Sequence, residues 1–238
     1  MKQLTRGAFA LPGTSLDFKT GTWRNEKPVH THWGAPCHVA CPAGEDAQAY
    51  IAKLMEGRPQ EAWEILVQAN PLPATTARVC PHFCEQSCNR KHMDQPIAIH
   101  LIERYLGDEA IKHNWAYPVD VNKEDGDPVC VVGAGPAGLS AAYHLRRLGH
   151  PVTLIDALPE AGGLLRSAIP VTRLPRDVLD AEIGRLLKLG IDFKPRTALG
   201  RDVTLDQLLN DYAYIFMGPG AGKSRHWSVD GAVPGDLR

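Results

Sequence analysis

Apolar residues in the first half of the chain recur at helical spacing. One set fits the i, i+3, i+4, i+7 template and precedes Gly57: Ala47, Tyr50, Ile51 and Leu54. A second helix is predicted from Pro59 to about Ala69, because proline suits a first turn and the following Asn-Pro-Leu-Pro stretch favours a turn. A third helix is predicted from Pro96, with Gly107 near its end and this apolar side: Ile97, Leu101, Ile102 and Tyr105.

Short apolar runs alternate with helical patterns in the second half. Strands are predicted at 129–132, 152–155, 191–193 and 212–217, and helices at 139–148, 175–189 and after Thr204. Such alternation is typical of a parallel sheet with helices on its faces. We therefore expect an α/β fold: an N-terminal all-α, cysteine-rich module followed by a Rossmann-like parallel sheet in the C-terminal half.

The polar stretch from Lys112 to Asp127 lacks either periodicity and predicts a domain boundary. We expect three parts: an extended arm (1–36), a helical module (37–115) and an α/β domain (128–238).

Composition limits the classes of partner. The chain has 44% apolar and 22% charged residues and a formal net charge of -1, so no sequence-wide positive field attracts nucleic acid or anionic lipid. We find neither an apolar run of about 18 residues nor a signal peptide, and we expect a soluble, cytoplasmic protein without nucleic-acid or membrane partners.

A glycine-rich motif, Gly133-Ala134-Gly135-Pro136-Ala137-Gly138, directly follows the first predicted strand and begins a helix. In this context G-x-G-x-x-G predicts a dinucleotide site, because the small residues let backbone amides and a helix N-terminus approach a pyrophosphate. Asp156 follows the second strand, 23 residues beyond Gly133, where it can accept hydrogen bonds from a ribose. Gly218 to Ser224 resembles a phosphate loop, but its spacing is one residue short of the Walker pattern.

Five of the six cysteines are crowded between Cys37 and Cys88, which favours metal or cluster ligation over disulfides. Cys37-x3-Cys41-Pro42 matches the end of a ferredoxin motif in which adjacent cysteines serve different clusters. Cys80, Cys84 and Cys88 have i, i+4, i+8 spacing, which places them on one side if the segment is helical. Zinc competes with iron, although no C-x2-C knuckle is present. Cys130, within an apolar run, is expected to be a buried hydrophobic residue.

Several motifs together resemble the small (beta) subunit of bacterial glutamate synthase and the N-terminal half of dihydropyrimidine dehydrogenase. They include Pro36-Cys37 to Cys41-Pro42, Asn70 to Pro73, Arg78 to Pro81, Cys88 to Arg90, the glycine motif and Arg173 to Pro175. The resemblance implies FAD at the glycine motif and these further flavin-site residues: Gly163, Leu165, Arg166, Arg173 and Gly220. Ser167-Ala168 departs from the aromatic-glycine pair usual there, which puts nearby flavin contacts in doubt.

The same resemblance implies iron-sulfur ligands. One [4Fe-4S] cluster would use Cys41, Cys80 and Cys84, with Glu103 in the fourth position. The alternative for Glu103 is an exposed residue or an ion pair with a neighbouring arginine. A second cluster is possible at Cys37 and Cys88, completed by His30, His32 or a partner, because this chain lacks the upstream C-x-x-C of the family.

The resemblance implies a flavoprotein and iron-sulfur subunit that passes electrons between FAD and the cluster to a larger partner subunit. No second glycine motif is present, so NAD(P)H would act through a domain outside this sequence or through a partner. We expect either a piece of a longer protein or a truncated subunit. The alternative is a non-catalytic assembly or relay subunit with a degenerate nucleotide site, and whether the chain is an enzyme stays open.

Overall fold

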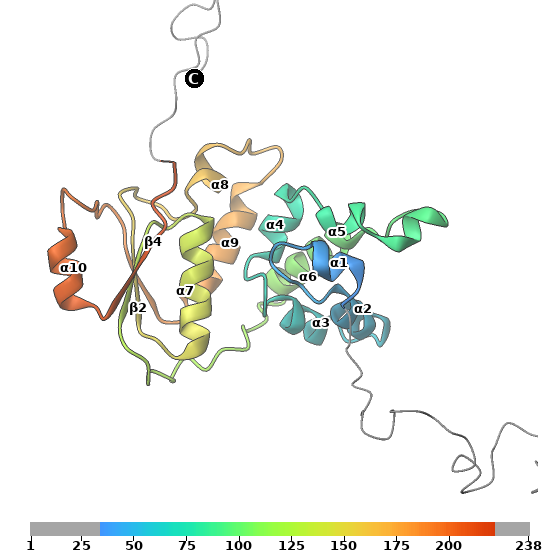
Figure 1. Ribbon diagram of the computed structural model, residues 1–238, viewed down its shortest axis with the longest axis horizontal. Coiled ribbons are helices and arrows are strands. Elements are labelled where there is room, and N and C mark those ends of the chain that lie inside the picture. The colour runs from blue at the N-terminus through green and yellow to red at the C-terminus, as the bar shows by residue number, and fades with distance from the viewer. Residues whose placement is uncertain (1–33, 222–238) are drawn as a thin grey trace, which may run out of the picture. The chain divides into compact units, whose positions relative to one another are not determined.

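The computed structural model describes residues 34–221, which belong to one compact unit. Figure 1 shows a helical region followed by a sheet flanked by helices. The helical region contains α1 (Pro36–Ala40), α2 (Ala47–Met55), α3 (Pro59–Leu66), α4 (Pro73–Val79), α5 (Phe83–Gln86), the short 3₁₀ helix η3 (Asn89–His92) and α6 (Ile99–Lys112). The second region contains β1 (Val129–Val132), α7 (Pro136–Leu148), β2 (Val152–Ile155), α8 (Leu164–Ser167), α9 (Arg176–Leu187), β3 (Ile191–Lys194), α10 (Leu205–Asp211) and β4 (Tyr214–Met217).

The strands of the described segment form a parallel sheet in the order β3-β2-β1-β4. Helices α7 and α9 lie on one face and α10 on the other (Figure 1). All four residues of β1 are buried, as expected of a central parallel strand. This arrangement confirms the expected α/β fold. The predicted domain boundaries stay predictions.

Prolines set the starts of several helices. Pro59 and Pro73 occupy first-turn positions, where the missing N–H has no intrahelical partner to lose. The Asn-Pro-Leu-Pro stretch therefore ends one helix and begins α4, a helix that the sequence did not lead us to expect. The segment of the cysteines is not one helix, so the condition for placing them on one side is not met: Cys80 follows α4, Cys84 lies in α5 and Cys88 precedes η3.

Helix α6 differs from its prediction in two ways. It begins at Ile99 rather than Pro96 and continues through Gly107 to Lys112. A Cβ at Gly107 would lie 2.4 Å from the backbone nitrogen of Ala74, so the glycine permits close packing against α4 instead of ending the helix. The expected apolar side was also wrong, because Leu101 is 52% and Tyr105 47% exposed, whereas Glu103 is buried.

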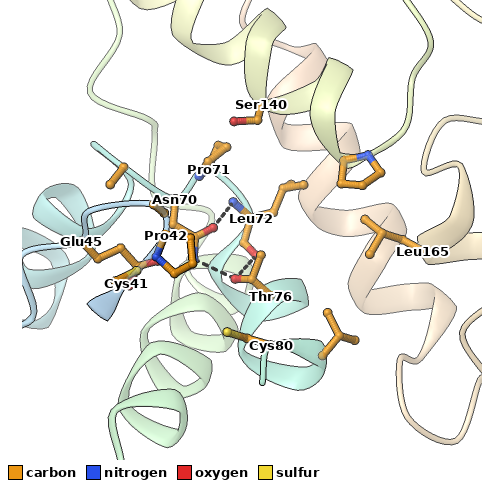
Figure 2. A pocket seen from close by; sticks show the side chains of 14 residues that line it. Cys41, Pro42, Glu45, Asn70, Pro71, Leu72, Thr76, Cys80, Ser140 and Leu165 are labelled. Atoms are coloured by element: carbon orange, nitrogen blue, oxygen red, sulfur yellow. Dashed lines mark hydrogen bonds between the residues drawn. The ribbon is translucent and has the colours of Figure 1, made fainter. Parts of the chain in front are cut away.

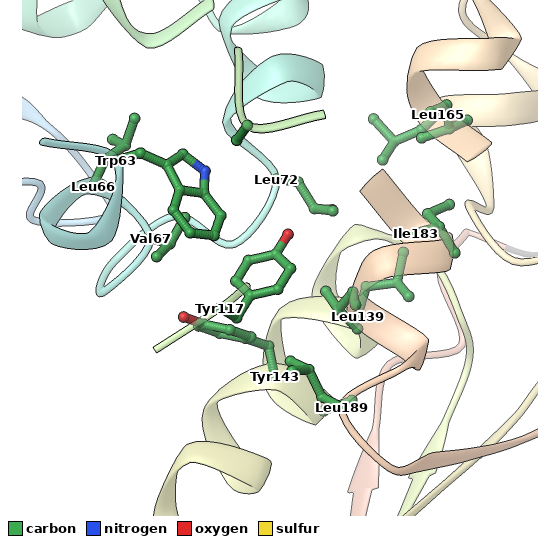
Figure 3. Packing of buried hydrophobic residues seen from close by; sticks show 14 of the residues in the cluster. Trp63, Leu66, Val67, Leu72, Tyr117, Leu139, Tyr143, Leu165, Ile183 and Leu189 are labelled. Atoms are coloured by element: carbon green, nitrogen blue, oxygen red, sulfur yellow. The ribbon is translucent and has the colours of Figure 1, made fainter. Parts of the chain in front are cut away.

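A continuous hydrophobic cluster joins the helical region to the face of the sheet covered by α7 and α9. Figure 3 shows Trp63 near Tyr117 and Tyr143, with Leu139 and Leu189 beyond them. The ring centroids of Trp63 and Tyr117 are 5.1 Å apart, and those of Tyr117 and Tyr143 are 5.3 Å apart. Because aromatic burial contributes strongly to stability, this cluster holds the two regions together.

A buried carboxylate adds a polar link between the regions. Glu182 of α9 accepts hydrogen bonds from the backbone N–H groups of Ala74 and Thr75, each at 2.7 Å. These donors belong to the first turn of α4, which has no side-chain cap of its own. Glu182 therefore stabilises the N-terminus of α4 from a helix more than a hundred residues further along the chain.

Among the helices of residues 34–221, none combines the length and apolar character required to cross a bilayer.

Candidate cofactor sites

The glycine motif connects β1 to α7 with little room for side chains. Gly133 has a φ of +101°, and a Cβ there would lie 2.2 Å from the carbonyl oxygen of Gly218. A Cβ at Gly138 would lie 1.7 Å from the carbonyl oxygen of Gly133. Both glycines are therefore required for the close approach of loop and helix, and the N-terminus of α7 stays open to a phosphate.

A cavity adjoins this loop and contains most of the predicted nucleotide-site residues. Seven of them line it: Gly133, Gly135, Pro136, Ala137, Asp156, Gly163 and Gly220. Asp156, at the end of β2, accepts hydrogen bonds from the N–H groups of Ala134 (2.6 Å) and Leu158 (2.8 Å). The carboxylate thus orders the loop from within the cavity.

The other predicted nucleotide-site residues lie outside that lining. Gly138 packs against Gly133, and Leu165 lines a neighbouring cavity. Arg166 bonds to the carbonyl oxygen of Ala161 and pairs with Asp180, and Arg173 is exposed. Their direct roles at a flavin stay predictions.

Three cysteines and a glutamate come from four separate elements of the helical region. Cys41 follows α1, Cys80 follows α4, Cys84 lies in α5 and Glu103 in α6. Burial raises the pKa of the Cys84 thiol to about 12, with nearby Glu103 as the next cause and Cys41 contributing further. Burial likewise raises the pKa of Cys80, and Glu103 and Cys41 act in the same direction. Glu103 and Cys41 therefore lie close enough to Cys80 and Cys84 to raise the pKa values of these two thiols.

Glu103 is neither exposed nor paired with an arginine within the described residues. Its side chain accepts a hydrogen bond from the Tyr50 hydroxyl at 3.1 Å. Burial raises the pKa of Glu103, and the adjacent carboxyl of Glu45 raises it further. The pKa of Glu45 is also raised by burial, although hydrogen bonds from Glu103 and Asn70 lower it in part. No cation is among these causes.

This donor set fits an iron-sulfur cluster. Buried thiols and carboxyls without a protein cation are costly to ionise, and bound iron supplies the positive charge that makes thiolate and carboxylate the stable forms. Cys41, Cys80, Cys84 and Glu103 would hold the cluster, which supplies one-electron transfer when bound.

The remaining cysteines differ in their surroundings. Backbone N–H groups, that of Ile97 first and those of Arg90 and Lys91 after it, lower the pKa of the Cys88 thiol. Cys37 lies in α1, and α1 packs against α5, which ends just before Cys88. His30 and His32, the other predicted contributors to a second cluster, lie outside the described residues. Cys130 is fully buried beside Val132, Ile155 and Leu208, which confirms its interpretation as a core residue.

An apolar cavity separates the cysteines from the glycine motif. Figure 2 shows Cys41 and Cys80 on the helical-region side and Ser140 and Leu165 on the other. Pro136, in the first turn of α7, lines both this cavity and the nucleotide cavity. The cavity has a volume of about 310 Å³. The space beside Cys41 and Cys80 and the space beside the glycine loop thus share Pro136 as a wall residue.

Two residues of the site were missed at the level of the sequence. Glu45 and Tyr50 have no motif of their own, and Tyr50 belongs to an ordinary apolar helical pattern. The position of Glu45 four residues after Cys41 was the available signal, but both side chains are buried, and Tyr50 meets its partner Glu103 only in the folded chain.

Comparison with known families agrees with this division of the chain. Residues 32–115 match the family described as dihydropyrimidine dehydrogenase domain II, 4Fe-4S cluster. Residues 131–182 match the family described as NAD(P)-binding Rossmann-like domain.

Individual relatives cover both segments. The chain is 38% identical over 216 residues to the NADPH-Fe(3+) oxidoreductase subunit beta of Geobacter sulfurreducens, covering 88% of this chain and 32% of the relative. It is 38% identical over 222 residues to the NADP(+)-dependent formate dehydrogenase subunit beta of Moorella thermoacetica, covering 84% and 31%. It is 38% identical over 196 residues to the glutamate synthase [NADPH] small chain of Escherichia coli, covering 82% and 42%.

The chain spans between 31% and 42% of the lengths of these curated relatives. Within that span, the matched segments correspond to the helical cysteine region and the glycine-motif domain. Over that span the chain is similar to the glutamate synthase small chain and to the two beta subunits, and its two segments match a 4Fe-4S family and a Rossmann-like family.

Proposed function

We propose that the chain is an electron-transfer unit in which FAD, held by the Rossmann-like region, exchanges electrons with at least one [4Fe-4S] cluster in the helical region. A flavin accepts a hydride pair and releases single electrons, whereas a cluster carries one electron at a time, so the two cofactors complement each other. By similarity to the relatives, NADPH would supply the electrons through protein outside this sequence.

The observation that carries this proposal is the cavity shared by the two regions. Its walls include Cys41 and Cys80 on one side and Pro136 and Leu165 on the other. A dinucleotide whose pyrophosphate lies at the N-terminus of α7 has an apolar space next to it for a planar ring. That space is bordered by two of the cysteines expected to hold the cluster.

Quantification of iron, sulfide, zinc and flavin in anaerobically purified protein tests the proposal. We expect about four iron and four sulfide per chain for one cluster, about twice that for two, and about one FAD. Zinc without sulfide would contradict the iron-sulfur assignment. Iron without flavin would favour the alternative of a relay subunit with a degenerate nucleotide site.

A larger partner subunit and a cytoplasmic location are part of the same proposal. The relatives are named as beta subunits or small chains. All six cysteines are free, which agrees with a reducing compartment. Purification of the native complex, followed by identification of its subunits, tests the partner, and fractionation of cells tests the location.

A further inference from the structure

Three side chains beside the proposed cluster ligands form a compact group: His82, Glu85 and His100. His82 lies between Cys80 and Cys84, Glu85 follows Cys84, and His100 lies in the first turn of α6, three residues before Glu103. Their potential ligand atoms lie within 4.8 Å of one another, so the group could be considered for a metal ion of its own.

The geometry of the two imidazole rings argues against that assignment. The rings of His82 and His100 are stacked, with centroids 4.0 Å apart and planes inclined by 20°. The lone pairs of nearly parallel rings point side by side, whereas two histidines that share one ion must direct their lone pairs at it. The group is therefore better explained by what it does to the adjacent backbone.

Glu85 is fixed by His100 through two contacts. Its Oε1 accepts a hydrogen bond from the backbone N–H of His100 at 2.9 Å and lies 2.6 Å from the ring Nδ1 of that residue. The first contact satisfies a free donor in the first turn of α6, which has no side-chain cap from its own Ncap residue. Glu85 thus joins the segment that carries Cys84 to the helix that carries Glu103.

The ring of His82 packs against His100, the partner of Glu85. Its φ of 58° is left-handed, a conformation that a non-glycine residue keeps only where its surroundings hold it. Its Nε2 is buried without a hydrogen-bond partner in the described residues, so stacking on His100 is the contact that orders the ring. In this conformation the backbone N–H of His82 donates to the Sγ of Cys80 at 3.4 Å.

The backbone N–H of Glu85 donates to the carbonyl oxygen of His82 at 3.1 Å and so closes the turn that carries Cys84. Hydrogen bonds to cluster sulfurs stabilise the more negative, reduced form and so raise the reduction potential. The side chain of His82, whose backbone N–H donates to Cys80, stacks on His100.

We propose that His100 is a positioning residue of the cluster site. Its stack with His82 directs the backbone N–H of that residue at the sulfur of Cys80, and its contacts with Glu85 fix the helix of Glu103 beside the segment of Cys84. This inference rests on the proposed function, because it requires a cluster at these cysteines.

The test compares His100→Ala with a matched control, His113→Ala, in the full chain with its cluster. His113 lies at the other end of α6, pairs with Glu109 at 3.1 Å and stacks on Trp115, so its removal loses similar contacts far from the cysteines. Three quantities are measured on chains with full iron content: the reduction potential, the electron-nuclear double resonance couplings of exchangeable deuterons in heavy water, and the rate of iron loss to a chelator.

For His100→Ala we expect a more negative reduction potential, weaker deuteron couplings and about tenfold faster loss of iron to a chelator. We expect His113→Ala to match the wild-type chain in all three. A His100→Asn variant, whose amide can retain the contact to Glu85, should fall between them, and it decides the question if His100→Ala does not fold.

Unchanged couplings and potential in an iron-loaded His100 variant would overturn the inference and leave the proposed function intact. Equal changes in His113→Ala would also overturn it, because the effect would then belong to α6 as a whole. A wild-type chain without iron and sulfide would overturn the proposed function itself, so the two failures are distinguishable.

Discussion

The nucleotide region and the cysteine region build their sites from different parts of the chain. At the glycine motif the site is made by backbone, and side chains matter by being absent: a Cβ at Gly138 would lie 1.7 Å from a carbonyl oxygen. In the cysteine region the site is made by side chains from four elements, and Glu45, Tyr50 and Glu103 are buried around them. A site built from backbone depends on a short local motif that the sequence shows directly. A site built from side chains depends on packing between residues that are far apart in the sequence.

We expect the largest effect, a loss of bound iron, from the replacement of one side chain in the cysteine region. Cys80→Ser should lower bound iron by about tenfold or more, because a weak alkoxide donor replaces a thiolate. Flavin content should stay near the wild-type value if the two sites are built independently. Iron, sulfide and flavin per chain are measured together.

Cys130→Ala is the control, since that buried thiol belongs to the sheet rather than to the cysteine region. Equal loss of iron in both variants would contradict the ligand assignment.

We expect the second largest effect, on stability and flavin content, from one methyl group added to the glycine motif. Gly138→Ala should destabilise the fold by about 3 kcal/mol and reduce flavin content, because the loop and α7 must separate. Urea unfolding and the flavin-to-protein ratio are measured.

Gly184→Ala in α9 is the matched glycine, since no atom lies within 4 Å of a Cβ built there. This change should stabilise the chain by about 0.5–1 kcal/mol. Destabilisation at both positions would show that close approach does not distinguish them.

A third variant addresses the link between the regions. Glu182→Gln keeps the size of the side chain but places an amide where the N–H groups of Ala74 and Thr75 need two acceptors. We expect a loss of about 1–3 kcal/mol in the free energy of unfolding. Chemical unfolding at fixed pH measures it.

The difference in stability between the wild-type chain and Glu182→Gln should depend on pH. Burial raises the pKa of Glu182 to about 7, above its value of 4.5 in the unfolded chain. Between these values the unfolded state releases a proton that the folded state keeps, so the contribution of Glu182 is largest below pH 4.5 and declines until about pH 7. The stability difference between wild type and Glu182→Gln should therefore shrink as the pH rises from 4.5 to 7. A constant difference over that range would refute the shift.

We expect the smallest effect on stability from a change at α10, far from the nucleotide and cysteine sites. Thr204 and Gln207 form a capping box at the start of α10, with hydrogen bonds of 2.8 and 3.2 Å. Thr204→Ala should cost about 1 kcal/mol in thermal unfolding and leave iron and flavin unchanged. A loss of either cofactor would show that the sites are sensitive to general destabilisation.

Much of the nucleotide region could be predicted from the sequence. The strand and helix pattern, the glycines and the cap at Thr204 are local signals, and each appears in the structure where it was expected. The cysteine region was less predictable. The spacing of Cys80, Cys84 and Cys88 fits one side of a helix, but Pro81 and the left-handed His82 separate α4 from α5, and only Cys84 lies in a helix.

Glu103 shows why the arrangement of the cysteine region could not be predicted from the hydrophobic pattern. Its helix carries exposed Leu101 and Tyr105, so the apolar periodicity pointed to the wrong face. The buried face is decided by Gly107, which brings α4 close, and by Tyr50, which bonds to the carboxylate across 53 residues. A hydrophobic pattern therefore cannot indicate that this carboxyl is buried.

The contact from Glu182 to α4 has a consequence for biogenesis. During synthesis, Cys41, Cys80, Cys84 and Glu103 all leave the ribosome well before residue 182. Until that residue emerges, the first turn of α4, the helix that ends at Cys80, lacks its acceptor. A cluster inserted into the nascent chain would therefore bind before α4 is stabilised. We expect insertion of iron and sulfide to follow the folding of the nucleotide region.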